Sequence, residues 1–298
     1  MMQVECKTLK FIDNFAKLFT MKHAFEPAEK DDIPIFSFAD GELGPISNAF
    51  IRGLEKVTGQ PRIKRLYVDY VNDDRPDSLF WQDAVDRLSL SVNVMMDKGA
   101  YIPETGRLLV IANHPFGVID GLILCSEISK IRQDYKIMTH QVLRQAPAVM
   151  HQILPVDFEN TEAALRINMQ TRKDAVQQIR NDGAVILFPS GGISLAPKVI
   201  GMAEDYEWKT FAAKLALMEN TTILPVFFSG QNSLMYMAAR KLSQTLGYSL
   251  MFREIVRRIG STVDVTIRKP IQSSDLSHFE TRNEVTSYLR SLTYGNSN

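Results

Sequence analysis

The segment NHPFGVID, residues 113–120, holds the histidine and the aspartate best suited to proton transfer. Histidine is the side chain whose unperturbed pKa lies nearest neutrality. A carboxylate bonded to its far ring nitrogen fixes the tautomer and stabilises the imidazolium formed in base catalysis. His114 and Asp120 are six positions apart, roughly 20 Å of fully extended chain. They meet only if the chain turns, and Pro115 and Gly117 permit that turn.

Two structural alternatives stay open for this segment. Asp120 is also placed to cap a helix that begins at Gly121, and a single histidine is often structural. No metal site is expected, because the other histidines lack the strand-end setting and the spacing of zinc ligands. These are His23, His140, His151 and His278.

The segment PSGGIS, residues 189–194, is a second candidate site. Its paired glycines allow backbone N–H groups to approach an anion closely. The alternative is an ordinary tight turn. Ser190 does not fit a serine-hydrolase nucleophile, because that elbow reads G-x-S-x-G and Phe188 stands where its first glycine belongs.

Both segments follow apolar runs that are typical of buried strands, LLVIA at 108–112 and AVILF at 184–188. A third run, TILPVFF at 222–228, leads into SGQNS. Helical patterns separate these runs, which predicts an α/β fold with a mostly parallel central sheet flanked by helices. Ligands bind beyond the carboxyl ends of strands in such sheets, so the three loops are expected to line one site.

The remaining periodic segments predict further helices and strands. The helices are expected at residues 77–98, 121–131, 161–181, 208–218 and 233–258. Asp77 is the expected N-cap of the first helix, and Gly99 its expected stop. The strands are expected at residues 136–139 and, as an edge strand, 263–267.

The 161–181 segment has a clear amphipathic pattern. Asn160 or Thr161 is expected to cap this helix, and Gly183 to stop it. Its buried face is expected to carry Leu165, Met169, Val176 and Ile179.

Composition excludes several classes of protein. The chain has 298 residues and a net charge of zero, with 34 basic and 34 acidic residues, which gives no support to nucleic-acid binding. Two cysteines, Cys6 and Cys125, form no disulfide framework and indicate a reducing cytoplasm. We expect no signal peptide and no spanning helix, because no apolar run reaches about 18 residues.

The expected helical region at 233–258 combines apolar residues with basic ones. An apolar face rimmed by basic residues can lie on an anionic membrane. The alternative is a core helix with a solvated charged side. The basic residues are Arg240, Lys241, Arg253, Arg257 and Arg258.

In this order and at these separations, NHPFGVID, FPSGGIS and ILPVFF resemble three blocks of the phospholipid/glycerol acyltransferase superfamily, the lysophosphatidic acid acyltransferase-like proteins. The resemblance covers about residues 100–230. It extends to about residue 272 for the hemolysin-like, or ornithine-lipid-type, aminolipid acyltransferase branch. It implies a glycerol-phosphate acyltransferase-like domain at 77–298, preceded by an N-terminal arm and helical segment at 1–76.

The resemblance also implies a chemistry. His114 would act as the base and Asp120 would orient it, while the acceptor attacks an acyl thioester directly. Acyl-CoA or acyl carrier protein is the expected co-substrate, with no cofactor and no metal. The expected partners are a lysolipid or lyso-aminolipid acceptor and a membrane surface, for a cytoplasmic protein peripheral on the inner face. Substrate contacts are expected from Asn113, Gly117, Ser190, Gly191, Gly192 and Lys209.

Two departures from the family pattern bear on the acceptor. Five residues, where the family has four, separate His114 from Asp120, and the turn at Pro115 can absorb the extra one. Ser190 and Ile193 stand where the family has a glutamate and an arginine. Losing these charges removes strong contacts to a phosphate-bearing acceptor, which favours another headgroup such as an acyl-amino acid.

Two rival functions stay open. A CoA-independent transacylase would move acyl chains between phospholipids without a thioester. A non-catalytic, hemolysin-like protein would only bind or disrupt lipid, although the intact pair of His114 and Asp120 argues against it.

Overall fold

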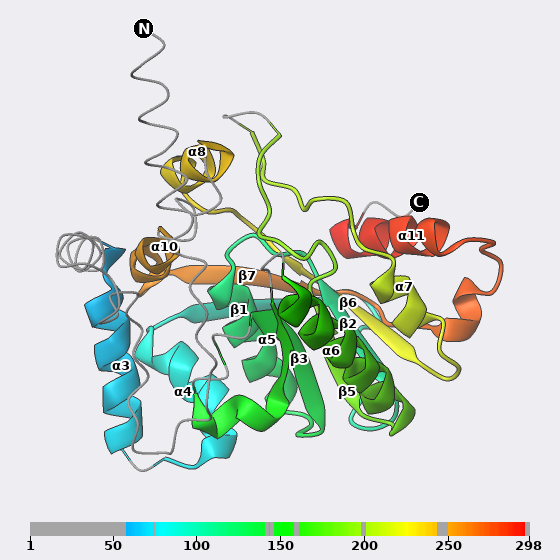
Figure 1. The fold of residues 1–298 in the computed structure, drawn as a ribbon, viewed down its shortest axis with the longest axis horizontal. Coiled ribbons are helices and arrows are strands. Elements are labelled where there is room, and N and C mark those ends of the chain that lie inside the picture. Colours follow the sequence, from blue (N-terminus) through cyan, green and yellow to red (C-terminus); the bar gives the residue numbers. More distant parts are fainter. Residues whose placement is uncertain are drawn as a thin grey trace, which may run out of the picture.

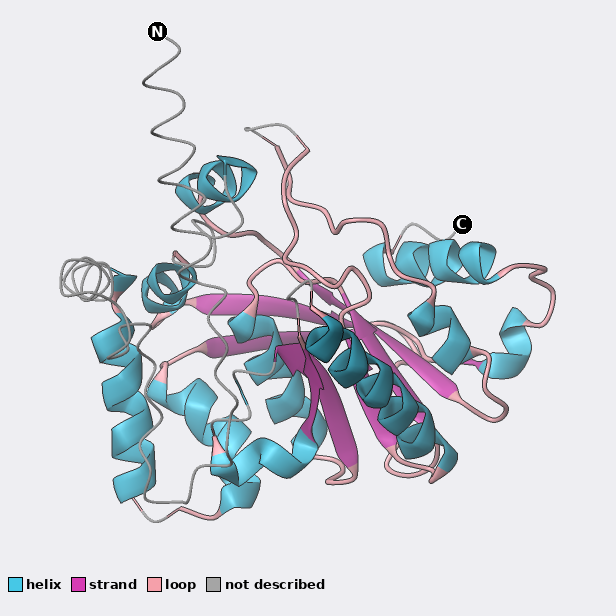
Figure 2. Cartoon of the chain, in the orientation of Figure 1, coloured by secondary structure: helices cyan, strands magenta, loops and turns pink. Residues whose placement is uncertain are grey.

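The computed structural model describes residues 58–73, 75–140, 143, 146–157, 161–197, 201–242 and 250–295. They form a central sheet with helices packed on both faces (Figures 1 and 2). Most of the expected N-terminal segment lies outside the described residues, and the domain boundary at residue 76 stays a prediction.

The described residues contribute eight strands to the sheet, in the order β1-β7-β6-β2-β5-β3-β4, with β8 paired to β6. Strands β2 to β6 are mutually parallel. Strand β7 runs antiparallel to β6, and β1 is parallel to β7. The predicted mostly parallel α/β sheet is therefore confirmed. The strands are β1 Ser91–Met96, β2 Leu108–Ala112, β3 Tyr135–His140, β4 Ile153–Val156, β5 Ala184–Leu187, β6 Thr222–Phe228, β7 Thr262–Ile267 and β8 Ile271–Gln272.

The α-helices cover both faces of the sheet. Helices α3, α4, α5 and α10 pack on one face, and α6, α7 and α11 on the other (Figure 1). The α-helices are α3 Gln60–Asn72, α4 Phe80–Arg87, α5 Val118–Ser129, α6 Glu162–Arg180, α7 Phe211–Ala216, α8 Leu234–Leu242, α10 Met251–Arg258 and α11 Arg282–Tyr294. Short 3-10 helices are η1 Asp77–Leu79, η3 Pro147–Gln152 and η4 Ser273–Leu276.

Strand β2 lies in the middle of the sheet and explains the continuous apolar run in the sequence. Leu108 and Val110 face the first helical layer, whereas Leu109 and Ile111 face the second, and all are fully buried. Its end pairs with β5 on one side and with β6 on the other. The carboxyl ends of these three strands therefore meet at one edge of the sheet.

The helix expected at residues 77–98 is wrong beyond residue 87. Helices η1 and α4 occupy 77–87, Ser89 adopts a positive φ of 48°, and residues 91–96 form β1. Strand β1 pairs in parallel with β7, far along the chain, and this long-range pairing outweighs the local helical spacing. Asp77 caps nothing through its side chain, and instead its carboxylate accepts a hydrogen bond from the Tyr70 hydroxyl at 3.3 Å.

The strand at 263–267 is not an edge strand, because β7 lies between β1 and β6. The expected edge position is wrong because β1, which was predicted as part of a helix, pairs with the outer side of β7. Strands β4 and β8 were not predicted either, since each is short and lacks a clear alternating pattern.

Helix α6 forms where expected, and Thr161 caps it by accepting a hydrogen bond from the Ala164 N–H at 3.1 Å. Asn160 lies outside the described residues. The expected buried positions Leu165 and Met169 are wrong, since they are 60% and 51% exposed. Small side chains let the helix lie close to the sheet. The buried residues are Ala164, Thr171, Ala175 and Ile179.

The region expected to be helical at 233–258 contains two helices, α8 and α10, and residues 243–249 between them lie outside the described residues. Within the described ranges, no helix combines the length and the apolar character needed to cross a bilayer.

Candidate active site

The chain turns after β2 so that the ring of His114 meets the carboxylate of Asp120. The His114 Nδ1 atom lies 3.0 Å from Asp120 Oδ2. Gly117 makes the turn with a φ of 74°, and a Cβ at this position would lie 2.8 Å from the Ile193 side chain. The Asp120 side chain is fully buried and the His114 side chain is 18% exposed. The remaining ring nitrogen, Nε2, is therefore left for a substrate.

Asp120 also organises the first turn of α5. Its Oδ2 atom accepts hydrogen bonds from the N–H groups of Phe116 at 2.8 Å and Gly117 at 2.9 Å. The predicted helix start at Gly121 is wrong, because α5 begins at Val118 and Asp120 lies within its first turn. From there the Asp120 carboxylate reaches back to the N–H of Gly117 and also meets His114. Burial raises the pKa of Asp120 above its ordinary value, and His114 and the two N–H groups act in the opposite direction.

The backbone of His114 is held by a second buried carboxylate, Asp205. Asp205 Oδ1 accepts hydrogen bonds from the His114 N–H at 3.0 Å and from the Ser194 hydroxyl. The Ser194 N–H donates to the His114 carbonyl at 2.8 Å, and Trp208 Nε1 donates to Asp205 Oδ2 at 2.8 Å. Asp205 thus ties the histidine to the PSGGIS loop, and burial raises its pKa. Asp205 was not among the residues predicted from the sequence.

The loop after β5 and the end of β6 complete the surroundings of the histidine. The Phe188 ring stacks on the His114 ring, with 4.1 Å between centroids. The Asn113 amide donates to the Phe228 carbonyl at 2.9 Å and accepts from the Phe228 N–H at 2.7 Å. These bonds show how Asn113 joins β6 to the histidine loop, and its predicted substrate contact stays a prediction.

The PSGGIS loop carries three of the predicted substrate-binding residues, Ser190, Gly191 and Gly192, and lies against Lys209. The Ser190 hydroxyl donates to the Gly192 carbonyl at 2.8 Å, which closes the turn. Gly191 has a φ of 64°, and a Cβ there would lie 2.7 Å from Nζ of Lys209. Glycine thus allows the exposed Lys209 side chain to lie across the loop. The backbone N–H of Lys209 also donates to the Pro189 carbonyl at 3.0 Å.

Comparison with known proteins identifies the family of the chain. Residues 91–298 match the protein family described as acyltransferase. The chain belongs to this acyltransferase family. The resemblance drawn from the three sequence blocks is therefore confirmed, and the protein is an acyltransferase.

The acyltransferase has distant relatives among named proteins. It is 22% identical over 201 residues to a lyso-glycine lipid O-acyltransferase of Phocaeicola vulgatus, covering 65% of this chain and 69% of the relative. It is 23% identical over 206 residues to a lyso-glycine lipid O-acyltransferase of Bacteroides thetaiotaomicron, covering 65% of this chain and 71% of the relative. The crystal structure of the 1-acyl-sn-glycerophosphate (LPA) acyltransferase PlsC from Thermotoga maritima aligns with 83% of this chain and 91% of its own, at 16% identity and a TM-score of 0.48.

The basic residues of α10 serve the fold of the acyltransferase. Arg253 and Arg257 pair with the buried Glu254 at 3.7 Å and 3.3 Å. The Arg258 guanidinium lies 3.7 Å from the centroid of the Phe116 ring and donates to the Gln231 carbonyl at 2.8 Å. These contacts are those expected for a packed helix, and Arg258 packs on the histidine loop, whereas the predicted membrane contact of this helix stays a prediction.

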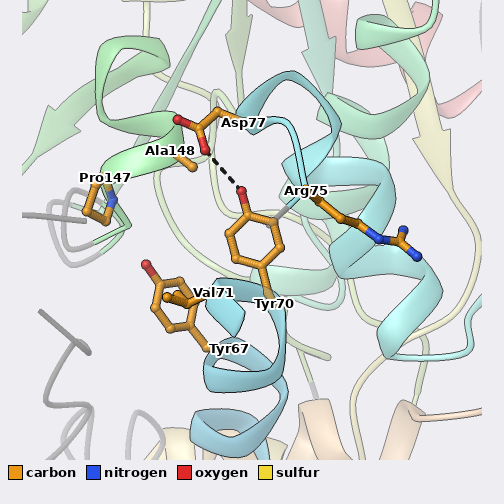
Figure 3. Close-up of a pocket in the computed structure, with 7 residues that line it drawn as sticks. All are labelled: Tyr67, Tyr70, Val71, Arg75, Asp77, Pro147 and Ala148. Atoms are coloured by element: carbon orange, nitrogen blue, oxygen red, sulfur yellow. Dashed lines mark hydrogen bonds between the residues drawn. The ribbon is translucent and has the colours of Figure 1, made fainter. Parts of the chain in front are cut away.

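A small pocket occurs elsewhere in the acyltransferase, between α3, η1 and η3 (Figure 3). Helix η3 leads into the amino end of β4, so this pocket lies toward the edge of the sheet opposite His114. It shares no residue with the loops around the histidine. In the part of the chain that the structure describes, no cluster of three histidine, cysteine or acidic residues could hold a metal ion. The pocket is lined by Tyr67, Tyr70, Val71, Arg75, Asp77, Pro147 and Ala148.

Proposed function

We propose that this acyltransferase moves a fatty acyl group from an acyl thioester to a hydroxyl oxygen of a lysolipid with an amino-acid headgroup. The observation that carries the proposal is the His114–Asp120 pair, 3.0 Å apart at the carboxyl edge of the sheet. The names of the two relatives, lyso-glycine lipid O-acyltransferases, support the acceptor class.

His114 acts as the general base in this proposal. Its Nε2 takes the proton of the acceptor hydroxyl while that oxygen attacks the thioester carbonyl carbon. Asp120 keeps the other ring proton on Nδ1 and stabilises the imidazolium. The carbon–sulfur bond then breaks, and the leaving thiolate takes the proton from His114. The products are an ester and a free thiol, with no acyl-enzyme.

The PSGGIS loop offers a donor for the oxyanion that forms during attack. The Gly191 N–H is already bonded to the Phe188 carbonyl at 3.0 Å. The Gly192 N–H has a long contact of 3.5 Å with the Ser190 hydroxyl. Gly192 is therefore the better proposed donor, since a short hydrogen bond to the oxyanion can replace a weak one.

The surroundings of the pair favour a headgroup with a carboxylate over one with a phosphate. Ile193 packs toward Gly117 and is 9% exposed, so the position of the family arginine carries no charge. The ammonium of Lys209 lies against Gly191 and supplies a single point charge. A glycine attached to a lipid through its nitrogen keeps one carboxylate that suits this cation.

We propose that the protein meets a membrane from one side, as a cytoplasmic peripheral protein on the inner face. The support is a group of exposed apolar residues on α8 and on the loop bonded to it. This loop is tied to the α8 region, because Gln231 accepts a hydrogen bond from the Ala203 N–H at 2.6 Å. The exposed residues are Met202, Tyr206, Leu234, Met235 and Leu242. The triple variant Leu234→Gln, Met235→Gln and Leu242→Gln should co-sediment less with vesicles, while its melting temperature should not change.

The proposed reaction is tested with purified protein and defined substrates. We expect thioester cleavage with acyl-CoA or acyl carrier protein when an N-(3-hydroxyacyl)glycine is the acceptor, and slower cleavage with lysophosphatidic acid. Acyl transfer from a phospholipid without any thioester would instead establish the transacylase. Binding to lipid without transfer from either donor would contradict the enzymatic role.

A further inference from the structure

Two asparagines at the carboxyl edge are equally buried but differently bonded. Asn113 and Asn232 are each 4% exposed. The Asn113 amide is fully engaged with the backbone of Phe228. Among the described residues, neither Nδ2 nor Oδ1 of Asn232 has a hydrogen-bond partner. A buried carboxamide without partners destabilises the fold, so its presence calls for a functional explanation.

The loop that carries Asn232 is held firmly against the histidine loop. A Cβ on Gly230 would lie 2.8 Å from the Phe116 ring, so the backbone of Gly230 packs directly on this side chain of the histidine loop. The Gln231 carbonyl accepts a hydrogen bond from Arg258 at 2.8 Å. The Ser233 N–H donates to Glu254 at 2.9 Å. Asn232 is therefore fixed between tethered neighbours, two positions from a glycine that touches the loop of His114.

We propose that the Asn232 carboxamide binds the amide linkage of the acceptor lipid, an inference that rests on the proposed function. Oδ1 requires a donor and Nδ2 requires an acceptor. A secondary amide provides both, through its N–H and its carbonyl. An ester linkage provides only acceptors, and the acceptor hydroxyl is already engaged with His114. An acyl-amino acid therefore satisfies Asn232, whereas an ester-linked lysolipid leaves Oδ1 buried and unpaired.

The inference predicts a preference for an amide over an ester. The test compares an N-(3-hydroxyacyl)glycine with the analogue in which oxygen replaces the N–H, so that the hydroxyl and the carboxylate are the same. The wild-type protein should prefer the amide by roughly tenfold to a hundredfold in kcat/KM, the cost of one unpaired buried group. Asn232→Leu, which keeps the size but removes both polar atoms, should abolish the preference.

Asn113→Leu is the matched control for stability. It should lower the melting temperature, because it leaves the N–H and carbonyl of Phe228 unpaired. Asn232→Leu should keep or raise the melting temperature, because it removes two unsatisfied atoms. Together with the lost amide preference, this contrast would identify Asn232 as a substrate-binding residue.

Two results would overturn the inference alone. One is an unchanged amide preference in Asn232→Leu. The other is a lower melting temperature with unchanged kcat/KM, which would indicate that the Asn232 side chain hydrogen-bonds a buried water and not the substrate. If the wild-type protein turned over neither acceptor with either thioester, the proposed function would fail and the inference with it.

Discussion

The two edges of the parallel sheet are organised by opposite charges. At the carboxyl edge, the buried carboxylates of Asp120 and Asp205 accept hydrogen bonds from backbone N–H groups of the histidine loop. At the amino edge, the buried guanidinium of Arg132 donates to backbone carbonyls before β2 and β5 and to Asp134 at 2.6 Å. Both arrangements fix loops, but they differ in their effect on the stability of the folded protein.

Arg132 has a strong carboxylate partner, whereas the buried acids near His114 are held mainly by neutral N–H groups. Burial raises the pKa of both Asp120 and Asp205, which means that their charged forms are unfavourable in the folded protein. The contacts of Arg132 at the amino edge therefore stabilise the fold. The buried acids at the carboxyl edge lower the stability of the fold while they hold His114 in place.

Asp120→Asn should give the largest effect among the residues that hold the loops. The amide oxygen can still accept from the N–H groups of Phe116 and Gly117, but the charge facing His114 is lost. We expect turnover to fall by about 10²- to 10⁴-fold. The measurement is kcat with saturating thioester and acceptor.

The same variant should keep its melting temperature, because a neutral amide is easier to bury than a carboxylate. A large loss of stability with normal activity per folded molecule would place Asp120 with Arg132, as a structural group, and would remove the contrast between the two edges.

Arg132→Met should have the converse effect. Its loss leaves several carbonyls before β2 and β5 without donors, so we expect the free energy of unfolding to fall by about 1–3 kcal/mol. Activity per folded molecule should not change. Urea unfolding and kcat measure the two effects.

Arg107→Met is the matched control at the same edge. Arg107 pairs at 3.0 Å with Asp182, whose side chain is 70% exposed, so this variant should cost less than about 1 kcal/mol. An equal cost for both arginines would show that burial of Arg132 contributes nothing.

The smallest expected effect concerns Asp205 and pH. Because its pKa is raised on folding, the folded protein binds this proton more tightly than the unfolded chain does. The carboxyl therefore lowers stability as pH rises through the folded pKa, and the penalty is fully present only above that pKa. Asp205→Asn lacks this titration. The stability of the variant relative to wild type should therefore be greatest above the folded pKa of Asp205 and decline as the pH is lowered, as measured by urea unfolding. A difference that stays constant with pH would contradict the assignment.

The elements predicted correctly are those whose local pattern matches their final surroundings. Strands β2 and β6 have the expected bounds, because a run buried on both faces needs no alternation to be recognised. The helix predicted at residues 77–98 is wrong in its second half, because Val92 and Met95 fit a helical spacing as well as a strand. Pairing with β7 decided between the two, and that partner lies far along the chain.

The candidate site was predictable where one short segment contained the chemistry. His114 and Asp120 share a single loop, and the structure brings them together. Asp205 follows His114 by 91 positions and stands in an irregular polar stretch. Only the fold places it against the His114 backbone, and the same is true of Arg258 against Phe116.

The most direct test of the central claim is the turnover of His114→Ala with an acyl thioester and an N-(3-hydroxyacyl)glycine. Removing a general base should lower kcat by about 10²- to 10⁴-fold. The melting temperature should change little, because the His114 side chain is partly exposed and its ring packs against Phe188 at the edge of the sheet. Turnover close to that of the wild-type protein, in a folded variant, would contradict the role of His114 as the base.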